Sequence, residues 1–361
     1  MEIGIIGLPF SGKTTLFATL TGQEPAAGHG GKVEVHRGVV KVPDERLDKL
    51  TAIFNPKKQV NATIEYLEVG GLEKDAAEGK GFDSQFLTVL KNTDVLLHVV
   101  RAFENEVYAH PLGSVDPVRD VNLVESEFIL SDLTIVENRI MRLEKQLQKV
   151  KNAEDARELE LMKKCREALE AEKPLREVEF SDEEERKLRG YRFLSAKPLI
   201  LVINYGENDI SKEAEILAPL REFAEKPWVE LAGLSAKVEM EISQLEDEDR
   251  QMFLEELGIA EPALPKLIRK SYELLGLISF FTVGEDECRA WTIRQNTPAQ
   301  KAAGAIHSDL ERGFIRAEVV AYDDFMANGS LAKCREKGVL RLEGKDYIVK
   351  DGDIINVRFN V

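Results

Sequence analysis

The chain has 361 residues, of which 43% are hydrophobic, and this length predicts two or three domains rather than one core. Its formal net charge is −16, so the chain as a whole is not attracted to nucleic acid or to anionic membranes, and any RNA contact needs a local basic patch. The three cysteines form no C-x-x-C pair, which favours plain thiols in a reduced cytoplasmic protein. Because the N-terminus runs directly into the first predicted strand, we expect no signal peptide, and no apolar run approaches the roughly 20 residues of a membrane span.

The first element is an apolar stretch at residues 3–6, followed by the pattern G-x-x-x-x-G-K-[ST] at Gly7, Gly12, Lys13 and Thr14. Glycines let successive backbone N–H groups point at one anion, and a helix that begins near Lys13 adds its positive end. The Lys13 ammonium reaches the β- and γ-phosphates, and the Thr14 hydroxyl is placed to bind Mg²⁺. A buried strand before the loop and apolar residues at helical spacing after it favour a phosphate loop over an ordinary strand–helix turn.

Further apolar runs along the chain predict more strands. Short, nearly continuous apolar runs occur at residues 62–72, 94–100 and 199–204, and helical stretches separate them. This alternation predicts a parallel sheet covered by helices on both faces. His98 lies inside one of these runs, and we interpret it as a hydrogen-bonded core histidine rather than a catalyst.

A long polar insert interrupts the series of strands. Apolar residues in its first half step by three and four as an a/d seam, at Leu133, Val136, Ile140, Leu143, Leu147 and Val150. A second charged helix after "NAED" carries apolar residues on one side, at Leu159, Met162, Cys165 and Leu169. These seams predict an antiparallel helical hairpin that projects from the sheet domain. Its mixed charges are typical of a solvated face, and a partner-binding tip is the alternative.

The last part of the chain predicts a compact α+β module. The runs at 279–283 and 289–293 predict paired strands, and Thr297 with Pro298 predicts the cap and first residue of a helix that ends at Gly313. Further short strands are expected in "RAEVVAY", "GVLRL", "DYIV" and "IINVRFNV". Residues 279–361 hold 12 lysines and arginines against 13 acidic residues, so the acidity of the chain lies elsewhere.

With these residues in view, the sequence resembles the YchF / Obg-like ATPase family of translation-factor-type P-loop NTPases over nearly its whole length. The resemblance is carried by "GLPFSGKTTLFATLT", "VGGLEKDAAEGKGFDSQFL", "DVLLHVVRAFE", "VDPVRD" and "VIN", and most strongly by the block from "YELLGLISFFTV" to the end. That block resembles the family's TGS domain, a β-grasp module found in several RNA- and ribosome-associated proteins. The implied fold is α/β: a P-loop NTPase parallel sheet (1–126 and 190–278), an inserted antiparallel helical hairpin (127–189) and a C-terminal β-grasp (TGS) domain (279–361).

The resemblance implies a set of nucleotide-binding residues: Phe10, Ser11, Gly12, Lys13, Thr14, Thr15, Asn204, Glu207, Ser235 and Ala236. The family usually has Asn-Val where this chain has Phe10 and Ser11. That asparagine can help to coordinate a monovalent cation and Phe10 cannot, which argues against a potassium-assisted mechanism. Lys13 also belongs to the implied catalytic residues.

The family's D-x-x-G motif corresponds to Glu68 and Gly71. The resemblance implies that Glu68 and Thr14 hold Mg²⁺, and that the Gly71 N–H senses the γ-phosphate as a catalytic group. Leu72 follows, where signalling GTPases place the glutamine that orients water, so slow intrinsic turnover is implied. Lys32 stands where the family has a magnesium-binding threonine, and a lysine cannot bind a cation.

The base-reading motif N-K-x-D is replaced here by "NYGE", with Tyr205 for the lysine and Glu207 for the aspartate. The family's N-x-x-E variant goes with relaxed base choice and a preference for ATP. The stretch "LSAK", with Ser235, Ala236 and Lys237, matches the loop that packs beside the base.

The sequence therefore predicts a cytoplasmic, Mg²⁺-dependent protein that binds ATP, with GTP as a further ligand, hydrolyses it slowly and regulates ribosome association by its nucleotide state. The expected partner is the ribosome or rRNA, reached through the TGS domain and the helical hairpin, with no membrane or DNA partner. One alternative is a GTPase of the same build, and another is a nucleotide-gated ribosome- or RNA-binding module with negligible hydrolysis. A basic surface is expected from Arg289, Arg294, Lys301, Arg312 and Arg316.

Overall fold

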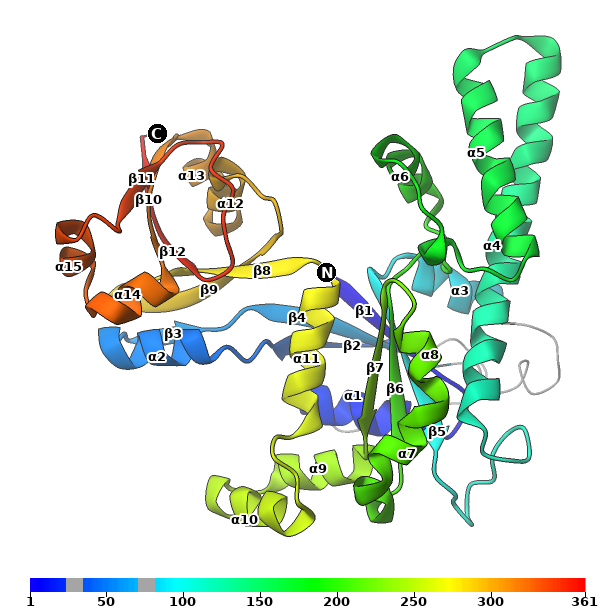
Figure 1. Cartoon of the computed structure of the whole chain (residues 1–361), viewed down its shortest axis with the longest axis horizontal. Coiled ribbons are helices and arrows are strands. Elements are labelled where there is room, and N and C mark those ends of the chain that lie inside the picture. The colour runs from blue at the N-terminus through cyan, green and yellow to red at the C-terminus, as the bar shows by residue number, and fades with distance from the viewer. Residues whose placement is uncertain (24–34, 71–81, 361) are drawn as a thin grey trace. The chain divides into compact units, whose positions relative to one another are not determined.

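The computed structural model describes residues 1–23, 35–70 and 82–360 (Figure 1). The chain folds into two compact units, one of Met1–Gly38 with Glu65–Leu264 and one of Val39–Ile64 with Pro265–Val361. The sequence boundaries at 126, 190 and 279 stay a prediction, and the structure groups Val39–Ile64 with the C-terminal residues. Among the described residues, no helix has an apolar stretch long enough to cross a bilayer.

The first unit is built on a six-stranded sheet of order β2-β4-β1-β5-β6-β7. β1 pairs in parallel with β4 and β5, β5 with β6, and β6 with β7, so the predicted parallel sheet is confirmed. Its strands are nearly continuous apolar runs because both faces are covered. The strands are β1 (Glu2–Ile6), β2 (Val35–Lys41), β4 (Thr63–Val69), β5 (Val95–Ala102), β6 (Leu199–Tyr205) and β7 (Val229–Leu234).

Helices pack on this sheet. Phe86 of α3 and Val121 and Phe128 of α4 are buried in one core with Leu67 of β4 and Leu96 of β5, while α1 contacts β1 and α9. The helices of this unit outside the hairpin are α1 (Lys13–Thr21), α3 (Ser84–Lys91), α7 (Glu213–Leu217), α8 (Arg221–Ala224), α9 (Ala236–Gln244) and α10 (Asp247–Leu257), with 3₁₀ turns η3 (Glu207–Lys212) and η4 (Ala218–Leu220).

The predicted antiparallel hairpin is present as α4 (Pro117–Lys149) and α5 (Ala153–Glu170) (Figure 1). The seam residues of both arms share one core, made of Val136, Ile140, Leu143, Leu161, Met162, Cys165 and Leu169 among others. The seam ends before the tip, because Val150 is 68% exposed. Helix α4 begins at Pro117 on the sheet, so the first arm is a direct continuation of a core helix. Shorter elements follow: η1 (Leu175–Glu177), α6 (Asp182–Leu188) and η2 (Arg189–Tyr191).

The second unit has its own six-stranded sheet, of order β11-β10-β12-β8-β9-β3. β8 and β9 are paired as predicted, and the pair is antiparallel. β12 runs parallel to β8, as in a β-grasp. The strands are β3 (Lys58–Val60), β8 (Leu277–Thr282), β9 (Glu287–Arg294), β10 (Phe314–Ala321), β11 (Arg341–Glu343) and β12 (Asp353–Phe359). The helices are α2 (Glu45–Phe54), α11 (Ala263–Leu274), α12 (Ala299–Ile306), α13 (Ser308–Arg312), α14 (Tyr322–Asn328) and α15 (Leu331–Glu336).

Segment 39–64 belongs to this unit because β3 is a strand of its sheet and α2 packs against β9. β3 pairs in parallel with β9. The Arg46 guanidinium lies 5.3 Å from the centre of the Phe281 ring and forms an ion pair with Asp351. The ring of Phe54 stacks on Phe325 at 5.4 Å between centroids. These contacts join residues more than 200 positions apart in the sequence, which is why periodicity alone did not reveal them.

Three local predictions for the C-terminal region were wrong. The helix expected up to Gly313 is split into α12 and α13, because His307 has an extended backbone and its Nδ1 accepts the Asp309 N–H as a cap. The cap of α12 is Pro298 itself rather than Thr297. "DYIV" forms no strand among the described residues, only a single bridge from Ile348 to Pro298.

Candidate nucleotide-binding site

The loop between β1 and α1 lies against the carboxyl ends of β5 and β6. Gly7 and Gly12 have φ values of 151° and 95°. A Cβ on Gly7 would collide with the Val99 carbonyl of β5, and one on Gly12 would collide with the Asn204 amide of β6. Only glycine fits at these two positions, and the loop therefore sits at the sheet edge where open α/β folds bind ligands.

Helix α1 begins at Lys13 with its N-terminus open to an anion. Gly12 is its N-cap, and no side chain caps the terminus in the part of the chain that the structure describes. The first N–H groups of a helix have no partner inside the helix, and the helix dipole favours negative charge there. Lys13 Nζ donates a hydrogen bond of 2.8 Å to the Leu8 carbonyl across the loop. The loop thus combines backbone donors with one ammonium group.

The two predicted metal ligands are in contact. The Thr14 hydroxyl donates a hydrogen bond to Glu68 Oε1, and Glu68 is buried at the end of β4. A hydroxyl and a carboxylate are suitable donors for Mg²⁺, which usually takes few protein ligands and completes its shell with phosphate and water oxygens. No group of three or more His, Cys, Asp or Glu among the described residues forms a metal cage on its own. Gly71, Leu72 and Lys32 lie outside the described residues.

Asn204 connects three parts of the site. Its Nδ2 donates to the Ser11 carbonyl at 2.9 Å, and its Oδ1 accepts the Ala236 N–H at 2.9 Å. Both hydrogen-bonding ends of the amide are thereby used to join the phosphate loop, β6 and the start of α9. In the structure Asn204 braces the loop, whereas the sequence motif predicted that it reads the base.

A cavity of about 720 Å³ adjoins the loop. Six of the residues proposed for nucleotide binding line it, namely Gly12, Thr15, Asn204, Glu207, Ser235 and Ala236. At the wall of the cavity, Lys237 forms a hydrogen-bonded ion pair with Glu207. The hydrogen bond to Glu207 raises the pKa of Lys237. Tyr205, where guanine-specific proteins have a lysine, donates its hydroxyl to Glu213 at 3.5 Å. The cavity is within the size range of small-molecule sites, and its contents remain a proposal.

The segment after β5 adds residues that sequence reasoning missed. Phe103, Glu104 and Asn105 line the same cavity. Arg101, buried at the end of β5, donates from Nε to the Phe103 carbonyl and from Nη2 to the Tyr108 carbonyl, both at 2.9 Å. An arginine at the end of a buried apolar strand was the available signal, because a buried guanidinium needs acceptors nearby.

Two buried histidines lie near this segment. His110 Nδ1 accepts the Leu112 N–H at 3.2 Å, and its Nε2 lies 2.9 Å from Asp120 Oδ2 in the first turn of α4. His98 is buried as expected, but neither ring nitrogen has a hydrogen-bond partner, so the expectation of a hydrogen-bonded histidine was wrong. Burial, with a smaller effect of the Lys13 charge, lowers the pKa of His98 to about 3.

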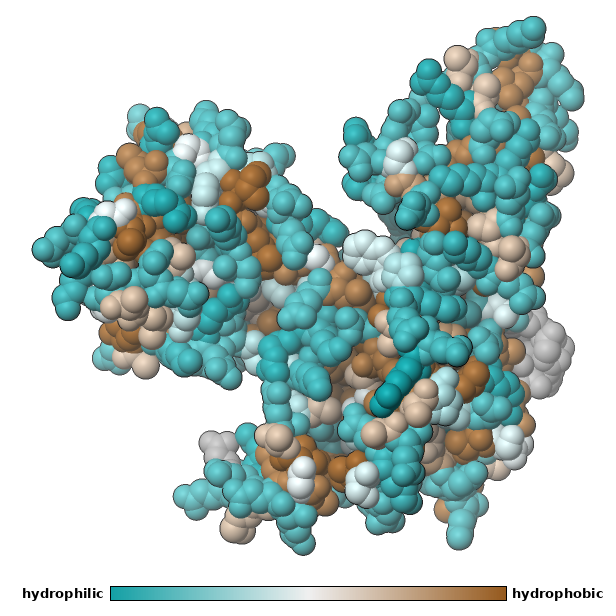
Figure 2. Space-filling view, in the orientation of Figure 1, coloured by the Kyte–Doolittle hydropathy of each residue, from teal (hydrophilic) through white to brown (hydrophobic). Residues whose placement is uncertain are grey.

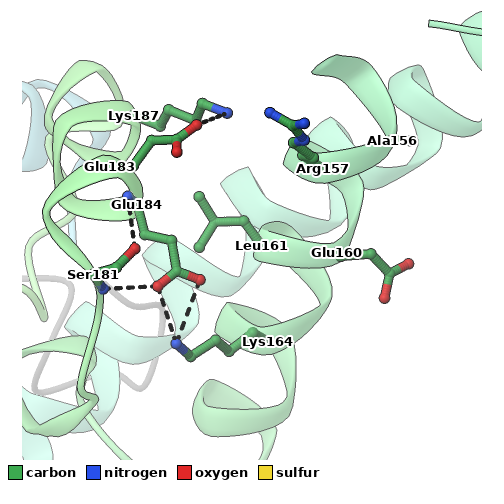
Figure 3. Close-up of a pocket in the computed structure, with 9 residues that line it drawn as sticks. All are labelled: Ala156, Arg157, Glu160, Leu161, Lys164, Ser181, Glu183, Glu184 and Lys187. Carbon is green, nitrogen blue, oxygen red and sulfur yellow. Dashed lines mark hydrogen bonds and ion pairs between the residues drawn. The ribbon is translucent and has the colours of Figure 1, made fainter. Parts of the chain in front are cut away.

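A second hollow of about 650 Å³ lies on the hairpin, between α5 and α6 (Figure 3). Lys164 is ion-paired with Glu184 there, and Lys187 with Glu183, while Leu161 points between the two helices. Figure 2 shows mainly hydrophilic residues on the visible surface of the hairpin arms. This hollow shares no residue with the cavity beside the phosphate loop, and its charges are largely paired with each other.

The strand, phosphate loop and helix on a parallel sheet define a P-loop protein of the GTPase class. Residues 2–205 match the family model described as "50S ribosome-binding GTPase", and residues 277–360 match the model YchF-GTPase_C, described as a protein of unknown function.

The chain is similar to known proteins over its whole length. The chain is 45% identical over 365 residues to "Ribosome-binding ATPase YchF" of Bacillus subtilis (strain 168), covering 100% of both. It is 42% identical over 363 residues to the protein of that name from Haemophilus ducreyi, covering 100% of this chain and 99% of the other. The solved structure of the Schizosaccharomyces pombe YchF GTPase matches 99% of this chain and 97% of its own, with a TM-score of 0.87 and 30% identity. The chain belongs to the YchF family, which confirms the resemblance.

Proposed function

We propose that this protein is a cytoplasmic, Mg²⁺-dependent ATPase of slow turnover whose nucleotide state regulates its association with the ribosome. The observation that carries the proposal is the contact of Thr14 with Glu68 beside the open N-terminus of α1. The relatives from Bacillus subtilis and Haemophilus ducreyi are named ribosome-binding ATPases, which supports both the ribosome as partner and ATP as nucleotide.

The phosphate end of the nucleotide would lie over the loop. The N–H groups at the start of α1 and the Lys13 ammonium would bind the β- and γ-phosphate oxygens. Thr14 and Glu68 would hold Mg²⁺, which neutralises negative charge on the phosphates. Asn204 keeps the loop fixed against α9, so these donors are arranged before the ligand arrives. Hydrolysis without a glutamine at position 72 would be slow.

The residues expected to contact the base favour ATP over GTP, the nucleotide of the GTPase alternative. Guanine is read through a carboxylate that accepts from its N1–H and N2–H₂ groups. Here Glu207 is already paired with Lys237, so binding guanine in that manner would require the ion pair to be given up. Adenine can bind without breaking this ion pair. We therefore expect the site to accept both bases and to bind ATP at least as tightly as GTP.

The ribosome contact of the second unit needs a different basic surface from the one expected. Arg289 lies on the same face of β9 as Trp291 and Ile293, which pack into the core under α12. Arg316 precedes the core residue Ala317 on β10 and therefore faces the opposite side of the sheet. Arg312 is paired with Asp309. The five basic residues therefore do not share one surface.

A basic patch does exist on the face of the sheet that carries Arg316. Glu318 accepts hydrogen bonds from Arg335 Nη2 at 3.0 Å and from Arg358 Nη2 at 2.6 Å, and Arg316 pairs in register with Arg358. We call Arg316, Arg335 and Arg358 the arginine patch. Three guanidinium groups against one carboxylate leave a local positive charge, which suits phosphate contacts on rRNA.

The test is binding and turnover with the full chain. Titration calorimetry with Mg·ATP and Mg·GTP measures base choice, and single-turnover hydrolysis separates an ATPase from a nucleotide-gated module. We expect ATP to bind at least as well as GTP and to be hydrolysed slowly. GTP binding tenfold tighter than ATP would favour the GTPase alternative, and no turnover above the uncatalysed rate would favour the module.

A further inference from the structure

The phosphate loop contains a turn in which a phenylalanine, Phe10, has a positive φ. Residues 8–11 form a β-turn closed by a hydrogen bond of 3.3 Å from the Ser11 N–H to the Leu8 carbonyl. Phe10 occupies the third position with a φ of 60°. A positive φ at this position is what a type II turn requires, and glycine or asparagine usually supplies it. An L residue with a large ring stays there only when its surroundings hold it.

One side chain is in place to hold it. The ring of Phe10 stacks on the ring of Tyr108, with centroids 5.2 Å apart and planes at 25°. The two residues are 53% and 54% exposed, so the pair is at the surface and is no part of a hydrophobic core. Burial therefore does not explain it.

Tyr108 itself is firmly supported. Asn105 Oδ1 accepts the N–H groups of Val107 and Tyr108, each at 2.9 Å, and the Tyr108 carbonyl accepts from Arg101 Nη2 at 2.9 Å. Arg101 is buried, and its guanidinium lies 4.7 Å from the centre of the Phe103 ring. Both backbone polar groups of Tyr108 are thus held, its N–H by Asn105 and its carbonyl by Arg101 of β5, while its ring stacks on Phe10 of the phosphate loop.

The conformation of the turn also places Lys13. The Leu8 carbonyl that closes the turn accepts a second hydrogen bond, from Lys13 Nζ at 2.8 Å. If Phe10 relaxed to a negative φ, the peptide groups on either side of it would rotate. The Leu8–Ser11 hydrogen bond and the direction of the Ser11 N–H would then change together. The orientation of groups meant for phosphate depends on Phe10 keeping its positive φ.

We propose that Tyr108 is a positioning residue for nucleotide binding, which acts through its ring on Phe10 to hold the phosphate loop in its anion-binding conformation. This inference rests on the proposed nucleotide function. It assigns a role to an aromatic pair that is exposed and is no part of the hydrophobic core.

The first test is the affinity for Mg·ATP by titration calorimetry. Tyr108→Ala removes the ring, and because an aromatic pair is worth about 0.5–1.5 kcal/mol, we expect affinity to fall about two- to tenfold. Tyr108→Phe keeps the ring and restores the parent affinity. Val107→Ala is the matched control, since Val107 is the adjacent residue, is 81% exposed and has no ring. The thermal midpoint of the nucleotide-free Tyr108→Ala protein should stay near that of the parent.

The second test is a double-mutant cycle with Phe10→Gly. Glycine adopts a positive φ without strain, so the loop no longer needs the ring. In the Phe10→Gly background, Tyr108→Ala should cause no further loss of affinity. Parent affinity in Tyr108→Ala, or equal losses from Tyr108→Ala in both backgrounds, would overturn the inference. A parent protein that binds no nucleotide would instead overturn the proposed function, and this inference with it.

Discussion

The hydroxyl of Thr14, in the first turn of α1, donates a hydrogen bond to Oε1 of Glu68, which lies 54 residues further along the chain at the end of β4. Glutamate is one methylene longer than the aspartate usual at this position, and the contact shows that its carboxylate still reaches the phosphate loop. The parallel pairing of β1 with β4 brings them together, because it aligns the carboxyl ends of both strands.

Replacement of Lys13 should weaken triphosphate binding most. Hydrogen bonds to charged groups contribute about 1.5–3 kcal/mol, so Lys13→Ala should raise the Kd for Mg·ATP roughly ten- to 150-fold. Titration calorimetry measures this, with Lys49→Ala, an exposed lysine of α2, as the control. Equal Kd values for Lys13→Ala and the parent would contradict the phosphate-loop assignment.

Glu68→Ala should act through Mg²⁺. If the carboxylate holds the metal, Glu68→Ala should lower the affinity for Mg²⁺ about ten- to 100-fold. Mg²⁺ should then increase the ATP affinity of the mutant less than it increases that of the parent. Titrating Mg²⁺ at fixed ATP measures this gain. With EDTA present, parent and mutant should bind ATP equally. A mutant that gains as much as the parent from Mg²⁺ would show that Glu68 is only a hydrogen-bonding partner of Thr14.

The ion pair of Glu207 with Lys237 should set base choice. Lys237→Ala releases the carboxylate for the N–H groups of guanine, and the ratio of the Kd values for GTP and ATP should fall. Because the pair is exposed, the change should be no more than about fivefold. Competition assays at low and high salt measure it, and high salt in the parent should shift the ratio in the same direction. An unchanged ratio would show that other residues select the base.

His98 predicts a pH dependence of stability. Burial lowers its pKa from 6.5 to about 3, so the unfolded chain takes up a proton below pH 6.5 and the folded chain does not. The free energy of unfolding should therefore decrease as pH falls from about 6.5 towards 3, by up to about 1.4 kcal/mol per pH unit. His98→Leu should unfold at a lower pH than the parent in acid titrations followed by circular dichroism.

The control for this titration is His307→Asn, which removes an exposed histidine and keeps a capping side chain for α13. This variant should unfold at the same pH as the parent. Identical acid-unfolding midpoints for His98→Leu and the parent would show that His98 takes up its proton without penalty in the folded state.

The sequence predicted elements whose signal is local. The loop at Gly12 and Lys13 and the seam of α4 and α5 follow from spacing alone, because glycine, lysine and heptad patterns act over a few residues. The stack of Phe10 on Tyr108 joins two loops 98 positions apart, and no local pattern reports it. The use of Asn204 as a brace is also non-local, since both of its partners come from other elements. The same holds for the packing of α2 on the C-terminal sheet.

That packing changes how the ribosome contact has to be tested. Deleting residues 279–361 would remove the sheet on which α2 and β3 pack and would uncover Leu47 and Leu50, which are fully buried. A truncated chain would therefore lose more than the proposed contact. Point substitutions on the full chain avoid this.

The arginine patch offers such a test. If Arg316, Arg335 and Arg358 bind rRNA phosphates, replacing all three with alanine should weaken co-sedimentation with ribosomes and reduce the salt slope of binding by about one unit per lost contact. Mg·ATP affinity should not change, because the nucleotide site belongs to the other unit. Arg289→Ala, on the opposite face of the sheet, is the control and should pellet like the parent. If the triple variant pellets with unchanged affinity and salt slope, the contact belongs to the helical hairpin or to the sheet of the first unit. If the parent never pellets in any nucleotide state, the ribosome proposal fails.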